Sequence, residues 1–194
     1  MSKSKIIAAI QKNKPAEVLL PSIPSFETGN AKPFDAFVAT AEAGGSQVFR
    51  ISDSPGLNTV INTLFPEAVN IASPLPTVRS TIDLEKIQST TDLESVDVAV
   101  IKGQLGVAEN GAVWVTEADC GQRVLPFITQ HLIILLDPAD IVHNMQEAYQ
   151  RIPVDATGFG LFIAGPSKTA DIEQSLVIGA QGARSLTIFL EASQ

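Results

Sequence analysis

Short, unbroken hydrophobic runs recur along this chain and are separated by segments of mixed polarity. Residues 96–101 and 132–136 are almost wholly apolar, which is typical of parallel strands covered on both faces. Residues 159–164 form a similar run bounded by glycines, and we expect a buried strand there. A final strand is expected over residues 185–190. These runs predict a sheet with a buried interior.

Between the runs, hydrophobic residues recur at helical spacing. Phe34, Phe37 and Ala41 share one face of a predicted helix that ends at the glycine pair 44–45. Further helices are predicted over residues 57–64, 83–95, 122–130 and 138–152. Short strands are predicted at 48–51 and 69–71. This alternation predicts an α/β fold, with a mainly parallel sheet flanked by helices.

The first 33 residues differ from the rest of the chain. Residues 2–13 predict a short helix with Ile6, Ile7 and Ile10 on one side. Four prolines then fall within residues 15–33, where a continuous helix or a central strand is implausible. We therefore expect an N-terminal helix and proline-rich arm over 1–33, followed by a single α/β domain over 34–194.

A β-hairpin is predicted near residues 106–116. Asn110 and Gly111 stand between apolar flanks, which is the strongest short-range hairpin signal. Glu109 precedes them, so its simplest interpretation is an exposed residue at a hairpin tip. A functional alternative for Glu109 depends on a family resemblance given below.

The polar segment that follows residues 159–164 is the main candidate ligand site. Gly165 lets a ligand approach the backbone, and a helix starting near Ser167 would offer free N–H groups to an anion. Lys168 adds a positive charge, which we expect to bind a small anion. The remaining candidates supply hydroxyls, carboxylates or a close glycine: Thr169, Asp171, Glu173 and Gly182. The alternative is a helix cap with a solvated first turn.

The same segment resembles a known family. Residues 165–173 read GPSKTADIE and are followed by Gly179 and by GARSL at 182–186, which is similar to the C-terminal signature of the lactate utilisation protein C family of LUD-domain proteins. GVAENG at residues 106–111 resembles a second, weaker family motif. Many relatives carry His-Gly-Pro where this chain has Gln181, Gly182 and Ala183. A function that depends on that histidine would be lost here.

The resemblance implies the NagB/RpiA/CoA-transferase-like fold and a role in the oxidation of L-lactate to pyruvate. It also implies two partners, the iron–sulfur lactate utilisation proteins A and B, which would hold the clusters. One cysteine cannot assemble a four-thiolate cluster, so no cofactor is expected in this chain. The chain would then be an accessory or ligand-binding subunit for a small carboxylate, and it could form a homo-oligomer.

The alternative is a stand-alone acyl-CoA transferase or sugar-phosphate isomerase. Ala108-Glu109-Asn110-Gly111 is similar to the Ser-Glu-Asn-Gly motif of CoA-transferases, whose glutamate attacks the thioester. Glu109 would then be the catalytic residue, and it would face the same cavity as Lys168 at the carboxyl edge of the sheet. This chain lacks the serine of the motif. Its 194 residues also leave no room for the second domain of those enzymes.

Composition excludes several other classes of function. The net charge is −8, with 21 acidic and 13 basic residues, and no basic run is present, which argues against nucleic-acid binding. No apolar run approaches the roughly 20 residues of a membrane span, so we expect a cytoplasmic protein. Cys120, His131 and His143 are not at metal-ligand spacing, and structural roles are expected for the two histidines.

Overall fold

The computed structural model describes residues 2–16, 18–19, 21, 32–50, 56–153, 158–169 and 177–191. Contacts divide the chain into two units, residues 1–30 and 31–194. Within the first unit, the predicted helix is confirmed as α1 (Lys3–Lys12), which buries none of its side chains. Most of the proline-rich segment lies outside the described residues.

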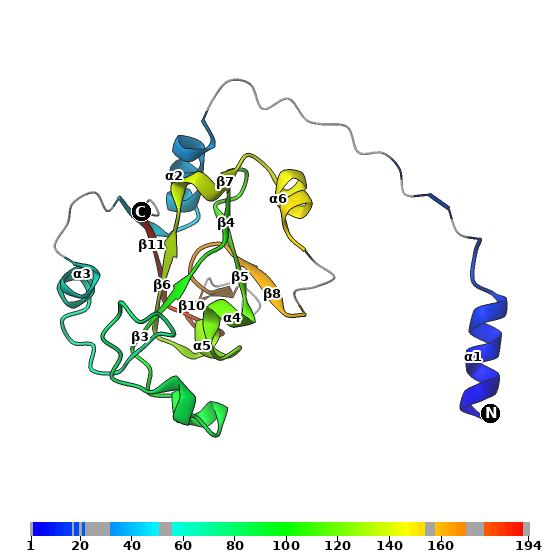
Figure 1. The fold of residues 1–194 in the computed structure, drawn as a ribbon, viewed down its shortest axis with the longest axis horizontal. Coiled ribbons are helices and arrows are strands. Elements are labelled where there is room, and N and C mark those ends of the chain that lie inside the picture. Colours follow the sequence, from blue (N-terminus) through cyan, green and yellow to red (C-terminus); the bar gives the residue numbers. More distant parts are fainter. Residues whose placement is uncertain are drawn as a thin grey trace. The chain divides into compact units, whose positions relative to one another are not determined.

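The second unit contains a five-stranded, entirely parallel sheet, in the order β1-β11-β6-β3-β2. Figure 1 shows its central strands β11, β6 and β3. Its strands are β1 (Gln47–Arg50), β11 (Ser185–Leu190), β6 (His131–Leu136), β3 (Val98–Lys102) and β2 (Ile71–Ala72). The predicted α/β class and the mainly parallel sheet are therefore confirmed.

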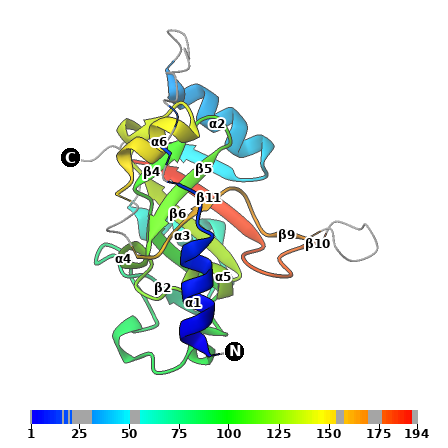
Figure 2. The ribbon, with the colours of Figure 1, turned by 90° about the vertical axis from the view of Figure 1, so that its right-hand side faces the viewer.

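A second sheet of four strands runs in the order β7-β4-β5-β8. Its strands are β4 (Leu105–Val107), β5 (Ala112–Thr116), β7 (Ile141–Val142) and β8 (Gly160–Ile163). Strands β4 and β5 are antiparallel neighbours, so the hairpin predicted near 106–116 is confirmed. A two-stranded antiparallel ribbon, β9 (Lys168–Thr169) with β10 (Val177–Ile178), projects from this unit (Figure 2).

The α-helices of the second unit are α2 (Pro33–Ala43), α3 (Leu57–Leu64), α4 (Glu117–Cys120), α5 (Leu125–Ile128) and α6 (Met145–Arg151). Helices α3 and α6 cover the outer faces of the two sheets, and α2, α4 and α5 adjoin the core between them. Three 3-10 turns are η1 (Leu84–Lys86), η2 (Thr90–Leu93) and η3 (Pro138–Asp140). Among the described residues, no helix is long and apolar enough to cross a membrane.

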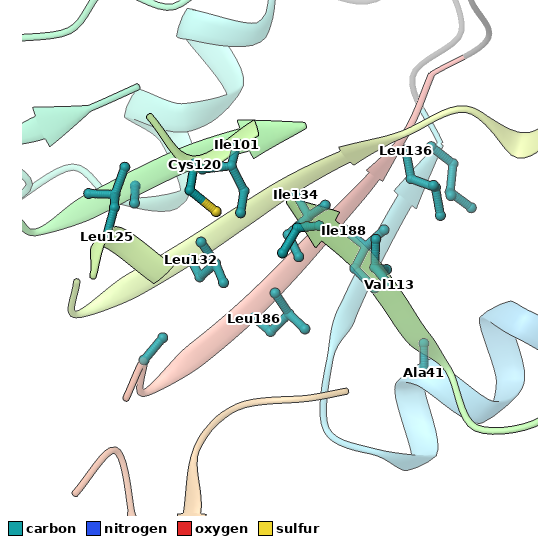
Figure 3. Close-up of a cluster of buried hydrophobic side chains, with 14 of the residues drawn as sticks. Ala41, Ile101, Val113, Cys120, Leu125, Leu132, Ile134, Leu136, Leu186 and Ile188 are labelled. Carbon is teal, nitrogen blue, oxygen red and sulfur yellow. The ribbon is translucent and has the colours of Figure 1, made fainter. Parts of the chain in front are cut away.

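The largest hydrophobic core lies against one face of the parallel sheet. Figure 3 shows Leu132, Ile134, Leu186 and Ile188 from β6 and β11 in this core, together with Val113 from the second sheet. Other members come from the adjoining helices: Ala41, Cys120 and Leu125. The two sheets therefore share one core, which explains why the central strands have no polar face.

Separate cores cover the other faces of the two sheets. Val98, Val100, Ile133 and Phe189 point to the opposite face of the parallel sheet, where Ile61 of α3 packs against them. The outer face of the second sheet is packed by α6 through residues that include Ala148. Successive residues of β3 thus face two different cores, as the period-two geometry of a strand requires.

Three predicted helices differ from the structure. Residues 83–95 form the two 3-10 turns η1 and η2, and only Leu125–Ile128 of the segment 122–130 is α-helical. The helix predicted from 138 to 152 is wrong in its first half, because Ile141 and Val142 pair with β4 as strand β7. Helix α6 begins later, where the Asn144 side chain accepts a hydrogen bond from the Glu147 N–H at 2.9 Å.

Candidate functional site

The loop between β8 and β9 is held in place by its backbone. Gly165 has φ of 76°, and a Cβ at this position would lie 2.5 Å from the Gly44 carbonyl oxygen, so the loop approaches the end of α2 as closely as glycine allows. The Ser167 N–H donates to the Ala183 carbonyl at 2.9 Å, and the Ser167 carbonyl accepts from the Gly179 N–H at 2.9 Å. The loop is therefore joined to the segment that leads into β11.

These bonds correct the helix predicted to start near Ser167. Lys168 and Thr169 are extended and pair with Val177 and Ile178 as the β9–β10 ribbon. The N–H of Ser167 is already bonded within the protein. A helix N-terminus therefore does not supply the anion-binding groups expected there. Any charge at this site comes from side chains.

The loop lines a cavity of about 340 Å³. Five of the predicted ligand-binding residues border it: Gly165, Ser167, Lys168, Thr169 and Gly182. Asp171 and Glu173 lie outside the described residues. Apolar side chains that include Phe127 and Leu161 complete the wall. The structure thus brings together the described members of the predicted site around one hollow.

The cavity lies at the opposite edge of the parallel sheet from the one predicted. Leu132 and Leu186 contribute to its wall, and they are the second residues of β6 and β11. The cavity is therefore at the amino ends of these strands. The expectation of a carboxyl-edge site rested on placing residues 159–164 in the parallel sheet. Strand β8 instead pairs antiparallel with β5 in the second sheet and is only half-buried.

Lys168 is anchored at the C-terminal end of α2. Its ammonium group donates to the Gly44 carbonyl oxygen, and its side chain is exposed. Gly44 is the C-cap of α2, where unpaired carbonyls concentrate negative partial charge that favours a cation. An ammonium group has three N–H donors. After one donates to Gly44, two others are left to bind an anion.

Gln181 also lines the cavity, although no sequence motif predicted it as a ligand. It occupies the position at which the family resemblance expects histidine. Next to it, Gly182 has φ of 148°, and a Cβ there would lie 3.2 Å from the Ser167 Cβ. The departure from the family pattern therefore falls within the candidate site. An amide replaces an imidazole on its wall.

Glu109 has a different environment. Its carboxylate accepts a hydrogen bond from the Met145 N–H at 3.0 Å, at the first residue of α6. The carboxylate thus satisfies a free N–H at a helix N-terminus, where negative charge is favoured. Within the described part of the chain, the lining of the 340 Å³ cavity does not include Glu109. The structure gives no support to the predicted shared cavity of Glu109 and Lys168.

The rest of the hairpin loop is structural. The Asn110 Oδ1 accepts from the Ala112 N–H at 3.0 Å. Gly111 is buried with φ of 67°, and a Cβ there would lie 2.6 Å from both the backbone N and the Cα of Ala41. The loop therefore packs backbone to backbone on α2. This contact explains the need for glycine at residue 111.

The other candidates from the sequence are Cys120, His143 and His131. Cys120 and His143 have structural surroundings, and His131 borders a different cavity. Burial, followed by the charges of Asp119 and Glu117, raises the pKa of Cys120 to about 12, so its thiol is protonated and buried at neutral pH. His143 forms an ion pair with Glu147 at 3.4 Å when its ring is protonated. In the described ranges, no group of three or more His, Cys, Asp or Glu side chains could hold a metal ion.

The comparisons with known proteins point to one family. The LUD domain family profile matches residues 78–190. "Lactate utilization protein C" of Shouchella clausii is 31% identical over 101 residues, which cover 49% of this chain and 44% of that protein. "Lactate utilization protein C" of Geobacillus kaustophilus is 29% identical over 101 residues, or 49% of this chain and 42% of that protein.

Two further similarities cover more of the chain. An uncharacterised protein of Neisseria meningitidis is 28% identical over 155 residues, which are 73% of this chain and 65% of that protein. Each of these three sequence relatives is matched over less than two thirds of its own length. A crystal structure of a DUF162 family protein from Deinococcus radiodurans superposes with a TM-score of 0.64 at 16% identity, covering 86% of this chain and 100% of that one.

The structural neighbour supports the fold, and the profile match extends over more than half of the chain, from just after β2 to the end of β11. The matched region contains both segments whose motifs resembled the family, residues 106–111 and 165–173. This chain belongs to the LUD domain family.

Proposed function

We propose that this chain is a ligand-binding accessory subunit of an L-lactate utilisation system. In this system, iron–sulfur partner proteins A and B carry out the oxidation of L-lactate to pyruvate. The proposal is supported by family membership and by the relatives named lactate utilization protein C. The iron–sulfur clusters are assigned to the partners because this chain has a single cysteine, and that cysteine is buried.

The observation that carries the binding role is the 340 Å³ cavity beside Lys168. The volume is at the small end for ligand pockets, which suits a small organic acid. The two ammonium hydrogens that Lys168 does not use on Gly44 can donate to a carboxylate. Ser167, Thr169 and Gln181 can contact a hydroxyl or carbonyl group on the same ligand.

Calorimetry on the purified chain tests this proposal. L-lactate and pyruvate should bind saturably, and Lys168→Met should weaken binding at least about tenfold, the scale of a lost hydrogen bond to a charged group. Lys86→Met is the matched control, because Lys86 is an exposed lysine paired with Asp83 at 2.8 Å and is not among the cavity residues. Undetectable binding to the original chain, or equal binding by both variants, would contradict the site.

A genetic experiment tests the role in the system. Deleting the gene should impair growth on L-lactate, and the two partner proteins without this chain should not restore it. A plasmid copy with Lys168→Met should restore growth less well than one with Lys86→Met. Full lactate oxidation by the partners alone would exclude an essential accessory role.

A further inference from the structure

We propose a second anion site, separate from the Lys168 cavity and formed by Arg184 and His131. It would bind an organic carboxylate that also has an apolar part. The site borders another cavity, of about 480 Å³, between the end of α3 and the residues that lead into β3, β6 and β11. The inference does not depend on the proposed role in lactate utilisation.

Arg184 is the proposed anchor for the carboxylate. Its backbone N–H donates to the Gln130 carbonyl at 2.8 Å, so its main chain is fixed at the entrance of β11. A Cβ on Gly179 would lie 2.4 Å from the Arg184 Cγ, so this glycine leaves room for the aliphatic part of the arginine. Among the described residues, the guanidinium group forms no ion pair and no hydrogen bond.

The position of the exposed, unpaired guanidinium distinguishes Arg184 from the other arginines. Arg50 pairs with Asp35 and Arg123 with Glu117, while Arg79 and Arg151 form no ion pair among the described residues but do not line this cavity. Arg184 borders a hollow and has no such partner among the described residues. A planar guanidinium can bind a carboxylate with two parallel hydrogen bonds.

His131 provides a second polar group on the same wall. Its Nδ1 lies 2.8 Å from the Ser185 hydroxyl oxygen, and its ring packs on Phe65 with centroids 4.7 Å apart. Burial and then the charge of Arg184 lower the pKa of His131, against an opposing effect of Asp97. The imidazole is therefore neutral at pH 7. When the Ser185 hydroxyl donates to Nδ1, the proton is on Nε2, which can donate to an anion.

Neither acidic residue of this cavity, Glu67 or Asp97, forms an ion pair with Arg184 among the described residues. The Asp97 Oδ2 accepts from the N–H groups of Val69 and Asn70, at 2.9 and 2.8 Å. Glu67 is exposed. Asp97 thus has a structural role in joining the segment before β2 to the start of β3. The cavity keeps one cation without an acidic partner among the described side chains.

The apolar part of the ligand is inferred from the opposite wall. Leu64, Phe65 and Pro66 border the cavity at the end of α3. A carboxylate that is attached to a ring or a branched chain could bury that part here while its charged group binds Arg184. Benzoate is therefore the preferred probe, and acetate is the matched probe that lacks the apolar part.

NMR of histidine-labelled protein can test the site, because the chain contains two histidines. Benzoate should shift the ring signals of His131 saturably and raise its pKa, since a bound anion favours the imidazolium. The signals of His143, which pairs with Glu147, serve as the internal reference and should not change. Acetate should bind at least about tenfold more weakly than benzoate, the scale set by burying a few apolar carbons.

Variants test whether the His131 response comes from benzoate bound to Arg184. Arg184→Gln should weaken benzoate binding at least about tenfold, while Arg184→Lys, which keeps the charge, should lose less. Arg123→Gln is the control for an exposed arginine outside the cavity. Lys168→Met should leave the His131 response unchanged, so failure of the Lys168 site and failure of this one are distinguishable.

Several outcomes would overturn the proposal. They are a lack of saturable shift at His131 in the original chain, equal binding by Arg184→Gln, or loss of the response in Lys168→Met. Binding of acetate as tightly as benzoate would contradict the apolar part of the ligand. The amide spectrum of each variant checks that it is folded.

Discussion

The two loops that carry the family motifs both contact the last turns of α2, yet they use the contact differently. In the 108–111 loop, Gly111 packs on the backbone of Ala41, and the Glu109 carboxylate is bonded to the start of α6. In the 165–169 loop, Gly165 approaches the Gly44 carbonyl, but Ser167, Lys168 and Thr169 border a cavity. The first loop therefore serves packing, while the second has polar groups available to a ligand.

The comparison shows that a motif does not reveal its role by residue type alone. Glu109 has the chemistry of a nucleophile, but a carboxylate bonded to a helix N-terminus is a cap. Lys168 has the appearance of a solvated surface lysine, but its ammonium group is fixed on Gly44 beside a hollow. Four substitutions test this difference, described from the largest expected effect to the smallest.

Gly111→Ala should cause the largest loss of stability. Positive φ costs an alanine of order 1–3 kcal/mol, and a contact of 2.6 Å with the Ala41 backbone adds overpacking of similar size. We expect the free energy of unfolding to fall by about 3 kcal/mol or more in chemical denaturation. Gly158→Ala is the matched control, with φ of 69° and no atom within 4 Å of the new Cβ. Equal losses for both variants would show that packing on α2 contributes nothing.

Gly165→Ala should affect stability less and binding more. Its φ of 76° and the 2.5 Å between an added Cβ and the Gly44 carbonyl oxygen are as restrictive as the values at Gly111. However, this loop borders a cavity and has room to move, so we expect a loss of about 2 kcal/mol. The displaced loop should bind small carboxylates more weakly in calorimetry. Unchanged affinity would mean that the Gly44 contact does not position Lys168.

Lys168→Met should lower stability by about 0.3–1 kcal/mol, the contribution of a cation at a helix C-terminus. The same change should remove most of the carboxylate affinity. Thermal unfolding and calorimetry on one preparation measure both effects. A large loss of stability with unchanged affinity would reverse the comparison, because Lys168 would then be structural.

Glu109→Gln should have the smallest effect, a few tenths of a kcal/mol in unfolding. Glutamine keeps an oxygen that can accept from the Met145 N–H and loses only the charge at the start of α6. Carboxylate binding should not change. If the purified chain transferred CoA and this variant did not, Glu109 would be catalytic. Its loop would then have a catalytic role as well as a packing role.

The strand pattern could be predicted because it depends on local features. Residues 132–136 lack polar positions and residues 96–101 contain only Asp97, and a strand without a polar face must be covered on both sides. Asn110 and Gly111 predicted the hairpin because few other residues suit such a turn. The resemblance of residues 165–173 to the LUD signature located the loop that lines the Lys168 cavity.

Only the tertiary structure decided how these elements combine. Strand β8 joins the second sheet because it pairs with β5, a partner about fifty residues away, and this pairing moves the following loop to the amino ends of β6 and β11. Ile141 and Val142 leave the predicted helix because β4 offers them hydrogen bonds. Arg184 and His131 are 53 residues apart and meet because β6 and β11 are parallel neighbours in register. A hydrophobic pattern indicates which faces are buried, but the partner that buries each face is set by long-range pairing.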